Sequence, residues 1–435
     1  MTSKAENELL TRVEGDAPLG RMLRENFWMP FARSESLAPG GAPQRVRLLG
    51  TNLVAFRGED GTLGLVDELC PHRRASLALA RVEGCSLRCI YHGWRTGADG
   101  SVLEVPSEGK RSGEFAAKVR VNHYRVREGG GLLWAFLGQS VQEGDEAPEL
   151  PPLPFMKVPA QSRWWCRMTV DCNWLQGVEG ECDSSHLTFL HRTFDNSDPR
   201  GNLLLLPVTD YVLEEADFGM RLVAVRDMAD GRSYVRVSSI AMPCDCWIPG
   251  GSKAVHFYVP AGDDGHSWRF NLNYSEQPVD RPPTQRGNEA LVDAEFTKLR
   301  NQKNHYRQDR AAQKSVNFTG MGDNFTVHDS AATESMGHIF DRSREHLGVS
   351  DKAVIGIRRY LLDVIKQYQQ SGEVPNTITD PARNRYTHTD TFAQIIEGND
   401  WRGAFPHLTP TADQVKEKAA TTSGFERPEV PAQPR

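Results

Sequence analysis

The sequence lacks any hydrophobic run long enough to cross a bilayer. Its densest apolar stretch, residues 203–206, is far shorter than the roughly 20 residues of a transmembrane helix. The first twenty residues contain no apolar core of a signal peptide. An excess of one charge is also missing, because 51 Lys and Arg stand against 57 Asp and Glu. This balance argues against binding to nucleic acid or to an anionic membrane surface. We therefore expect a soluble, cytoplasmic protein.

Cysteine is scarce as well, with 8 residues in 435. Without a signal peptide, so few cysteines argue against a disulfide framework. Five of them lie in apolar or aromatic surroundings, where we expect buried thiols: Cys166, Cys172, Cys182, Cys244 and Cys246. A further absence is G-x-G-x-x-G between a strand and a helix, and the EGGG at 128–131 is better interpreted as a hairpin turn. The chain therefore shows no signature of a nicotinamide or flavin site.

Two regions of different character follow one another along the chain. Residues 45–139 contain short strand-like runs separated by Gly-rich turns, which predicts a small all-β unit. The later half contains longer strand-like runs, at 163–172, 220–228, 233–242, 252–261 and 266–275. Helical patterns accompany them at 174–190, 287–312 and 351–371. We therefore predict an α+β protein whose larger unit is an antiparallel sheet covered by helices.

The boundaries follow from composition. The stretch 143–160 is acidic and Pro-rich, which favours extended chain and predicts a linker. The end of the chain is polar and shows no periodicity. We predict an N-terminal helical segment packed on the larger domain, a small all-β domain, the linker, the larger domain and a tail, over residues 1–24, 25–142, 143–160, 161–407 and 408–435.

Two Cys-His pairs stand close together in the small domain, Cys70-x-His72 and Cys89-x-x-His92. Two thiolates and two imidazoles can hold zinc, so a zinc site is one interpretation. In a Rieske centre, however, two Cys hold one iron of a [2Fe-2S] cluster and two His hold the other. Both pairs fall at turns of predicted strands and each supplies one ligand of each kind, which favours the Rieske interpretation.

The stretch from Cys70 to Trp94, C-P-H-R followed by C-x-Y-H-G-W, resembles the Rieske domain of the Rieske non-haem iron oxygenases. Respiratory Rieske proteins carry two further cysteines that form a disulfide across these loops. This chain has Arg73 and Ile90 there, and its additional Cys85 falls in the hairpin between the pairs. The resemblance therefore implies the oxygenase type, with Trp94 shielding the cluster or closing the core of the domain.

A second motif lies in residues 173–191, which contain Asp183-x-x-His186-x-x-x-x-His191. Non-haem Fe(II) oxygenases bind iron through two His and one carboxylate. Residues five apart lie about 140° apart around an ideal helix, so two such His would not converge on one ion. We therefore expect a helix end or a π-bulge within the LTFL sequence between them. The alternative is an ordinary helix with two buried, hydrogen-bonded histidines.

The pattern N-W-x-Q-x-x-E-x-x-x-D-x-x-H-x-x-x-x-H resembles the mononuclear-iron motif of the same oxygenases. The resemblance implies that His186 and His191 bind the iron. It also implies that Asp183 bridges, for electron transfer, to His72 or His92 of a neighbouring chain. Such a bridge requires a ring of subunits, most simply a homotrimer or stacked trimers.

The carboxylate ligand must come from another part of the sequence. By the family's pattern, in which an acidic residue just precedes a late helix, Asp329 is the predicted ligand and Asp323 the runner-up. An Asp before a helix also commonly serves as an N-cap, which is the purely structural alternative for either residue.

The segment from residue 305 to 351 resembles the phthalate dioxygenase type of Rieske oxygenase, and the similarity extends over about residues 7–393. This type implies a single kind of large oxygenase subunit that acts on aromatic carboxylates of the phthalate or isophthalate class. The type also includes enzymes that remove O-methyl groups or split diaryl ethers. Since the chain has no nicotinamide or flavin signature, we expect a separate NAD(P)H-dependent reductase with flavin and iron-sulfur groups.

An aromatic carboxylate needs a cation in its pocket, for which Arg is well suited. The second half offers many, among them Arg192, Arg221 and Arg236, and the sequence does not choose between them. Two other classes stay open: a Rieske electron carrier without oxygenase activity, and a zinc protein. An oxygenase should hold about three irons per chain, two in the cluster and one mononuclear.

Overall fold

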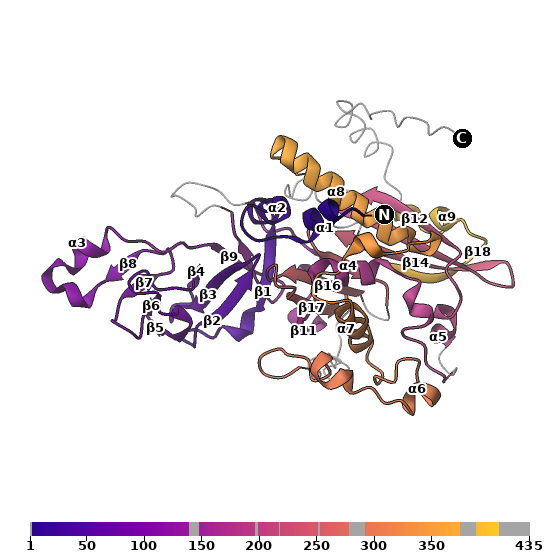
Figure 1. Cartoon of the computed structure of the whole chain (residues 1–435), viewed down its shortest axis with the longest axis horizontal. Helices are drawn as coiled ribbons and strands as arrows, with labels where there is room; N and C mark the ends of the chain where they lie inside the picture. The colour runs from indigo at the N-terminus through magenta and orange to yellow at the C-terminus, as the bar shows by residue number, and fades with distance from the viewer. Residues whose placement is uncertain are drawn as a thin grey trace.

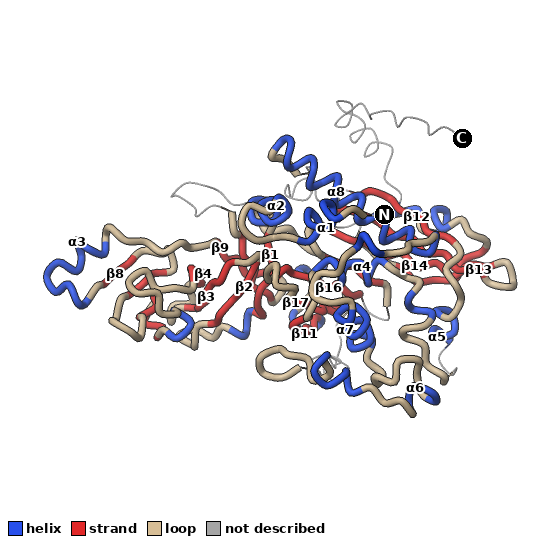
Figure 2. The backbone as a smooth tube through the Cα atoms, in the orientation of Figure 1, coloured by secondary structure: helices blue, strands red, loops and turns tan. Residues whose placement is uncertain are grey.

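The computed structural model describes residues 2–138, 148–195, 199–216, 218–250, 253–277, 292–374 and 389–408. It has two lobes (Figure 1). The small lobe, residues 27–138, consists mainly of strands and loops, whereas most helices lie in the large lobe, residues 148–408 with the two N-terminal helices (Figure 2). Within the described residues no helix is long and apolar enough to cross a bilayer.

The small lobe contains three antiparallel sheets, in the orders β1-β10-β9, β2-β3-β4 and β5-β6-β7-β8. The turn at Gly130 and Gly131, both with positive φ, joins β9 to β10. The interpretation of EGGG as a hairpin turn is therefore confirmed. Glycine suits this turn because it adopts a positive φ at little cost. The strands are β1 (Trp28–Arg33), β2 (Gln44–Leu48), β3 (Thr51–Arg57), β4 (Leu63–Asp67), β5 (Arg81–Glu83), β6 (Ser86–Arg88), β7 (Arg95–Gly97), β8 (Val102–Glu104), β9 (Arg125–Gly129) and β10 (Leu132–Phe136).

The large lobe is built on an antiparallel sheet of order β11-β17-β16-β15-β14-β13-β12, with β18 paired to one half of β14. All five predicted strand runs are strands, whereas β12, β15 and β18 had no strong alternating pattern. The α+β prediction is confirmed. The strands are β11 (Arg163–Val170), β12 (Asp210–Ala216), β13 (Gly219–Asp227), β14 (Arg232–Ala241), β15 (Asp245–Ile248), β16 (Lys253–Pro260), β17 (Ser267–Tyr274) and β18 (Phe392–Glu397).

Helices cover this sheet (Figure 1). The longest, α8, buries residues three or four apart, including Ile357, Leu361 and Ile365, as an amphipathic helix should. It ends at Gly372, whose left-handed φ of 74° is typical of a glycine helix terminus. The helices are α1 (Lys4–Thr11), α2 (Pro18–Asn26), α3 (Ser112–Ala116), α4 (Trp174–Cys182), α5 (Pro199–Leu204), α6 (Ala312–Ser315), α7 (Phe325–Ser335), α8 (Lys352–Ser371) and α9 (Trp401–Ala404).

Of the three predicted helices, the one at 351–371 is confirmed as α8, and two need correction. Residues 287–291 lie outside the described residues, and 292–311 form turns and a short 3-10 helix. His305, Tyr306 and Arg307 all have positive φ, which no α-helix accommodates. The helix predicted over 174–190 ends at Cys182.

The hydrophobic core is continuous across the two lobes, because residues of β1 and β10 cluster with those of α4, β16 and α8. A second core lies within the small lobe and includes Cys70, Cys89 and Trp94. The predicted domain boundaries stay predictions, since 143–147 of the linker and 409–435 of the tail lie outside the described residues.

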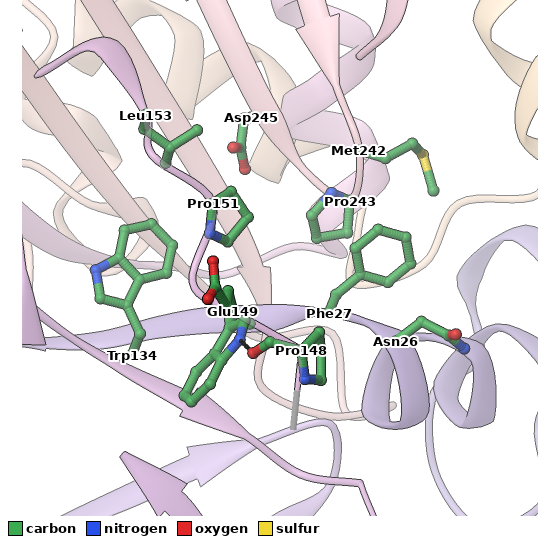
Figure 3. Close-up of a pocket in the computed structure, with 11 residues that line it drawn as sticks. Asn26, Phe27, Trp134, Pro148, Glu149, Pro151, Leu153, Met242, Pro243 and Asp245 are labelled. Carbon is green, nitrogen blue, oxygen red and sulfur yellow. Dashed lines mark hydrogen bonds between the residues drawn. The ribbon is translucent and has the colours of Figure 1, made fainter. Parts of the chain in front are cut away.

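The lobes meet at a cavity of about 20 Å³, which Glu149 and Pro151 line together with Trp134 of the small lobe and Asp245 of the large lobe (Figure 3). Asp245 is 4% exposed. Its burial raises the pKa of this carboxyl well above the usual range. Asp245 is therefore a carboxyl group that stays protonated to higher pH than a solvated Asp.

Candidate metal centres and the active-site cavity

The two Cys-His pairs lie in two neighbouring loops of the small lobe, one after β4 and one between β6 and β7. Cys70 and Cys89 are buried, whereas His72 and His92 are half-buried. The two imidazole rings lie with their centroids 4.5 Å apart at 74°. The structure therefore brings the four predicted cluster ligands together, with thiols towards the core and imidazoles towards the surface.

Backbone hydrogen bonds shape both loops. The Cys70 amide donates to the Ala75 carbonyl (2.9 Å), and the Cys89 amide donates to the Trp94 carbonyl (2.9 Å). Gly93 has a φ of 73°, which a residue with a side chain would adopt only with strain. The indole of Trp94 stacks on His72 at 4.7 Å and 3°, and is itself buried. Trp94 therefore both fills the core and covers one cluster-ligand candidate.

The chemistry of the donors fits an iron-sulfur cluster. Burial raises the pKa of the Cys70 thiol to about 11, and the neighbouring Cys89 adds to this shift. Thiolates are stable in such a place only if a bound cation compensates their charge. All eight cysteines are free, and Cys85 is exposed between β5 and β6. The five cysteines predicted as buried thiols are all buried.

His186, His191 and Asp329 form a group that could hold a metal ion, the only such group of three or more within the described part of the chain. His191 Nε2 lies 3.2 Å from His186 Nε2 and 3.0 Å from Asp329 Oδ1. His186 Nε2 lies 3.8 Å from the same oxygen. Ligands about 2.1 Å from one ion at right angles lie about 3 Å apart. The three atoms therefore fit one face of an octahedral ion, as in the two-His, one-carboxylate triad.

The local chain geometry differs from the expected one. No bulge within LTFL is needed, because α4 ends before both histidines and His186–Thr188 is a single 3-10 turn. The Asp183 carboxylate accepts from the Ser185 amide (2.7 Å), which stabilises this turn after the helix. Asp329 does not precede a helix but lies inside α7, whose N-cap is Asn324. The N-cap alternative for Asp329 is therefore wrong.

The surroundings of the triad favour the protonation states that bind a metal ion. Burial alone would raise the pKa of Asp329, but the hydrogen bond and charge of His191, then Arg269 and His186, lower it below its usual range. Arg269 Nη2 lies 3.7 Å from Asp329 Oδ2. Burial lowers the pKa of His186. At neutral pH the group therefore offers a carboxylate and a neutral imidazole, the forms that bind metal.

Asp183 lies next to the triad. Its Oδ2 is 3.8 Å from His186 Nδ1, on the ring side opposite the atom that faces the triad. Its Oδ1 also accepts from the Tyr211 hydroxyl (3.4 Å). The side chain is 25% exposed, so a group approaching from outside the chain can reach the carboxylate.

A cavity of about 830 Å³ opens onto the triad and Asp183. Leucines 203–205 and Ile248 supply apolar walls. Of the three arginines considered from the sequence, Arg192 and Arg236 line the cavity. Arg221 instead donates to the Leu408 carbonyl (2.7 Å) and pairs with Glu214. A cavity of this size holds a small aromatic molecule.

Sequence reasoning missed a polar network on the cavity wall. Glu181 Oε1 accepts from the Tyr258 hydroxyl (2.8 Å) and from Arg269 (3.0 Å), and lies 2.7 Å from His256 Nδ1. Burial alone would raise the pKa of Glu181, but His256 and Arg269 lower it to about 2. Tyr258 and Arg269 are cross-strand partners on β16 and β17. The alternation of His256 and Tyr258 in an otherwise apolar strand was the available signal.

The other polar residues of the second motif form hydrogen bonds within the protein that stabilise its fold. The Asn173 side chain caps α4 at the Leu175 amide, and Gln176 donates to the carbonyls of Thr333 and Gly337 (2.9 Å each). Glu179 accepts two hydrogen bonds from Arg342 (2.8 and 2.9 Å) and one from Arg358 (2.6 Å). These contacts fix α4, and with it the turn that carries His186.

Comparison with known proteins agrees with this geometry. Residues 27–125 match the family described as Rieske [2Fe-2S] domain, and residues 136–423 match LigXa C-terminal domain like. The chain is 36% identical to the phthalate 4,5-dioxygenase oxygenase subunit of Pseudomonas putida, over 92% of this chain and 94% of that protein. It is 30% identical to the 5,5'-dehydrodivanillate O-demethylase oxygenase subunit of a Sphingobium strain, over 92% and 89%. The solved structure of Pseudomonas putida CBB5 NdmA matches with a TM-score of 0.57 at 20% identity, over 88% of this chain and 99% of that one, which concerns the fold alone.

Proposed function

Because the chain belongs to the Rieske non-haem iron oxygenases of the phthalate dioxygenase type, we propose that it hydroxylates an aromatic carboxylate of the phthalate or isophthalate class. The chain is a terminal oxygenase with a Rieske [2Fe-2S] domain and a mononuclear iron domain. The observation that carries the substrate proposal is the arginine-lined cavity beside the triad.

In this proposal Cys70 and Cys89 hold one iron of the cluster, and His72 and His92 hold the other. His186, His191 and Asp329 hold the mononuclear iron. When bound, the cluster passes single electrons and the mononuclear iron activates O₂. The protein's part is to fix the donor atoms, orient the substrate and keep bulk water away.

Arg236 is the proposed carboxylate-binding residue. It lies on β14, lines the cavity and is only partly exposed. Of its five N–H donors, the described part of the chain shows one engaged, with the Pro249 carbonyl (3.3 Å). The remaining donors suit a bidentate contact with a carboxylate. Arg192 also lines the cavity but is exposed, so solvent weakens its contribution.

Electrons reach the mononuclear site through Asp183 in this proposal. The cluster loops adjoin the β5–β8 sheet towards one end of the molecule, whereas α7 lies in the large lobe (Figure 1). A partly exposed Asp183 beside His186 suits a contact with His72 or His92 of another subunit. We therefore propose a homotrimer, or stacked trimers, in which each small lobe serves the neighbouring large lobe.

Oxygenase subunits of such multicomponent systems receive electrons from a reductase or ferredoxin partner. The partner in our proposal is an NAD(P)H-dependent reductase with flavin and iron-sulfur groups. A cytoplasmic location is also proposed, and the eight free cysteines support it because thiols persist in a reducing compartment.

A single-turnover assay tests the substrate proposal. The iron-loaded protein is reduced chemically and exposed to ¹⁸O₂ with phthalates, methoxybenzoates or phenoxybenzoates, and the products are identified by mass spectrometry. We expect two ¹⁸O atoms on the ring of a phthalate, and we expect Arg236→Gln to weaken phthalate binding more than the control Arg192→Gln does. Reoxidation of the cluster without product from any carboxylate would refute the proposal.

O-demethylation or diaryl-ether cleavage of a substituted benzoate is the second candidate. The similarity to an O-demethylase subunit favours it, since that relative and the phthalate 4,5-dioxygenase subunit each match 92% of this chain. Formaldehyde released from a methoxybenzoate in the same assay would establish it. The electron-carrier and zinc alternatives predict two irons or none per chain, whereas the oxygenase holds about three.

A further inference from the structure

His328 is a buried histidine that touches the triad without belonging to it. It precedes Asp329 on α7 and is 2% exposed. Its Nε2 lies 2.8 Å from the Gly322 carbonyl oxygen, and its Nδ1 lies 3.3 Å from His191 Nδ1. Three groups therefore form one hydrogen-bonded row, from the Gly322 carbonyl through His328 to His191.

The direction of this row follows from its first member. A carbonyl oxygen only accepts, so His328 Nε2 must carry the proton that it donates to Gly322. In a neutral imidazole the other nitrogen is then an acceptor, which leaves His328 Nδ1 with a lone pair. The contact with His191 is a hydrogen bond only if His191 Nδ1 donates. With a cation at the triad, neutral His191 then offers the ion its lone pair on Nε2, the atom that faces His186 and Asp329.

From this row we infer that His328 is a positioning residue for the mononuclear iron: it holds His191 in the tautomer and orientation whose Nε2 binds the metal. The inference rests on the proposed function, since it needs iron at the triad. Hydrogen-bond partners of ligating histidines commonly orient the ring and raise its basicity.

The surroundings of His191 show that the hydrogen bond and the ring packing are separable. Phe325 stacks on the His191 ring at 4.1 Å and 9°, from the first turn of α7. His328 lies one helical turn further, with its ring at 23° to that of His191. Phe325 packs on the face of the ring, whereas His328 contacts one particular nitrogen, Nδ1, and leaves Nε2 for the triad. Phe325→Leu is therefore a matched control that removes packing and leaves the row intact.

The test measures iron binding and not turnover. In the full-length protein with its cluster intact, the mononuclear site is emptied with a chelator and titrated with Fe(II). The ferrous-nitrosyl EPR spectrum then reports the geometry of the site. We compare His328→Leu, which removes the acceptor, with His328→Asn, whose amide oxygen can accept from His191 Nδ1.

We expect His328→Leu to bind Fe(II) about 10–100-fold more weakly than the parent protein and to broaden the nitrosyl signal. We expect His328→Asn to retain most of the affinity and Phe325→Leu to change it little. Equal affinities for the parent and His328→Leu would overturn the inference. If His328→Leu loses its cluster or fails to fold, His328→Asn decides alone, and a loss of affinity with an intact cluster would overturn the inference.

The same titration separates this inference from the function on which it rests. If the parent protein binds no iron beyond the cluster, or if His186→Ala binds it equally well, the proposed iron site itself is wrong. If the parent binds iron through His186 and the His328 variants bind it equally well, only the role of His328 is wrong.

Discussion

Replacing Glu179 by Gln removes a buried negative charge that pairs with Arg342 and with Arg358 of α8. This charge thereby holds α4 against two other segments, close to the turn that carries His186. Glu179 on α4 accepts two hydrogen bonds from Arg342 and one from Arg358, and Arg342 also donates to Asn7 of α1 (2.9 Å). The Arg342 and Arg358 side chains are 0% and 4% exposed. A Gln of the same size leaves Arg342 buried without a counter-charge, while Arg358 keeps Glu345.

The expected cost is about 3–5 kcal/mol, the usual range for breaking a buried ion pair from one side. At about 2 °C or more per kcal/mol, the large lobe should melt roughly 6 °C or more below the parent protein. We expect the variant to lose mononuclear iron as well, because α4 ends at Cys182, shortly before the turn that carries His186. The matched control is Glu8→Gln, which breaks an exposed pair with Arg12 and should cost under about 1 kcal/mol.

The pH dependence gives a second check. Burial opposes ionisation of Glu179, but Arg342 and Arg358 lower its pKa below the ordinary value of 4.5. The ion pair therefore stabilises the protein fully above that value and loses its contribution as pH falls below it. The difference in unfolding free energy between the parent and Glu179→Gln should therefore become smaller in acid. A free energy of unfolding within about 1 kcal/mol of the parent's at pH 7 would refute this reasoning. So would a difference in unfolding free energy that does not change with pH.

Three further predictions concern other sites. Asp183→Asn should keep both metal centres but lower product formation about 10–100-fold, measured by iron content and single turnover; an unchanged yield would contradict the bridge. Asp245→Asn should gain stability relative to the parent as pH rises above 3.8, by about 1.4 kcal/mol per pH unit up to the raised pKa of the folded carboxyl, because over this range Asp245 ionises in the unfolded chain but stays protonated in the folded protein; denaturation midpoints at pH 5 and 8 measure this, and parallel shifts would contradict it. Cys85→Ser should retain the visible absorption of the cluster and Cys89→Ser should abolish it, and the opposite result would make Cys85 a ligand.

The elements that could be predicted from sequence are those with a local signal. The five predicted strands of the large sheet, β11, β13, β14, β16 and β17, are eight or more residues long and alternate or run apolar, and α8 repeats its apolar residues every three or four positions. The helix predicted over 287–312, before α6, was wrong because its residues have a helical composition while His305 to Arg307 adopt positive φ. Tertiary contacts set that backbone, and no pattern along the sequence records them.

The candidate site divides in the same way. His186 and His191 stand in one short motif, so their pairing was visible, and Asp329 required a family resemblance because about 140 residues separate it from them. Arg269, Glu181 and His328 approach the triad from β17, α4 and α7. Their roles depend on which strands and helices become neighbours, which composition and spacing do not reveal.

The hydrogen bond between Asn7 and Arg342 joins residues 335 positions apart. At a synthesis rate of about 5–20 residues per second, α1 leaves the ribosome about 15–70 s before its partner exists. The strands of the small lobe are translated within that interval, and their second core contains no residue of the large lobe. The N-terminal helix is therefore synthesised before the small lobe but can dock only after it. The packing of the large lobe is completed last.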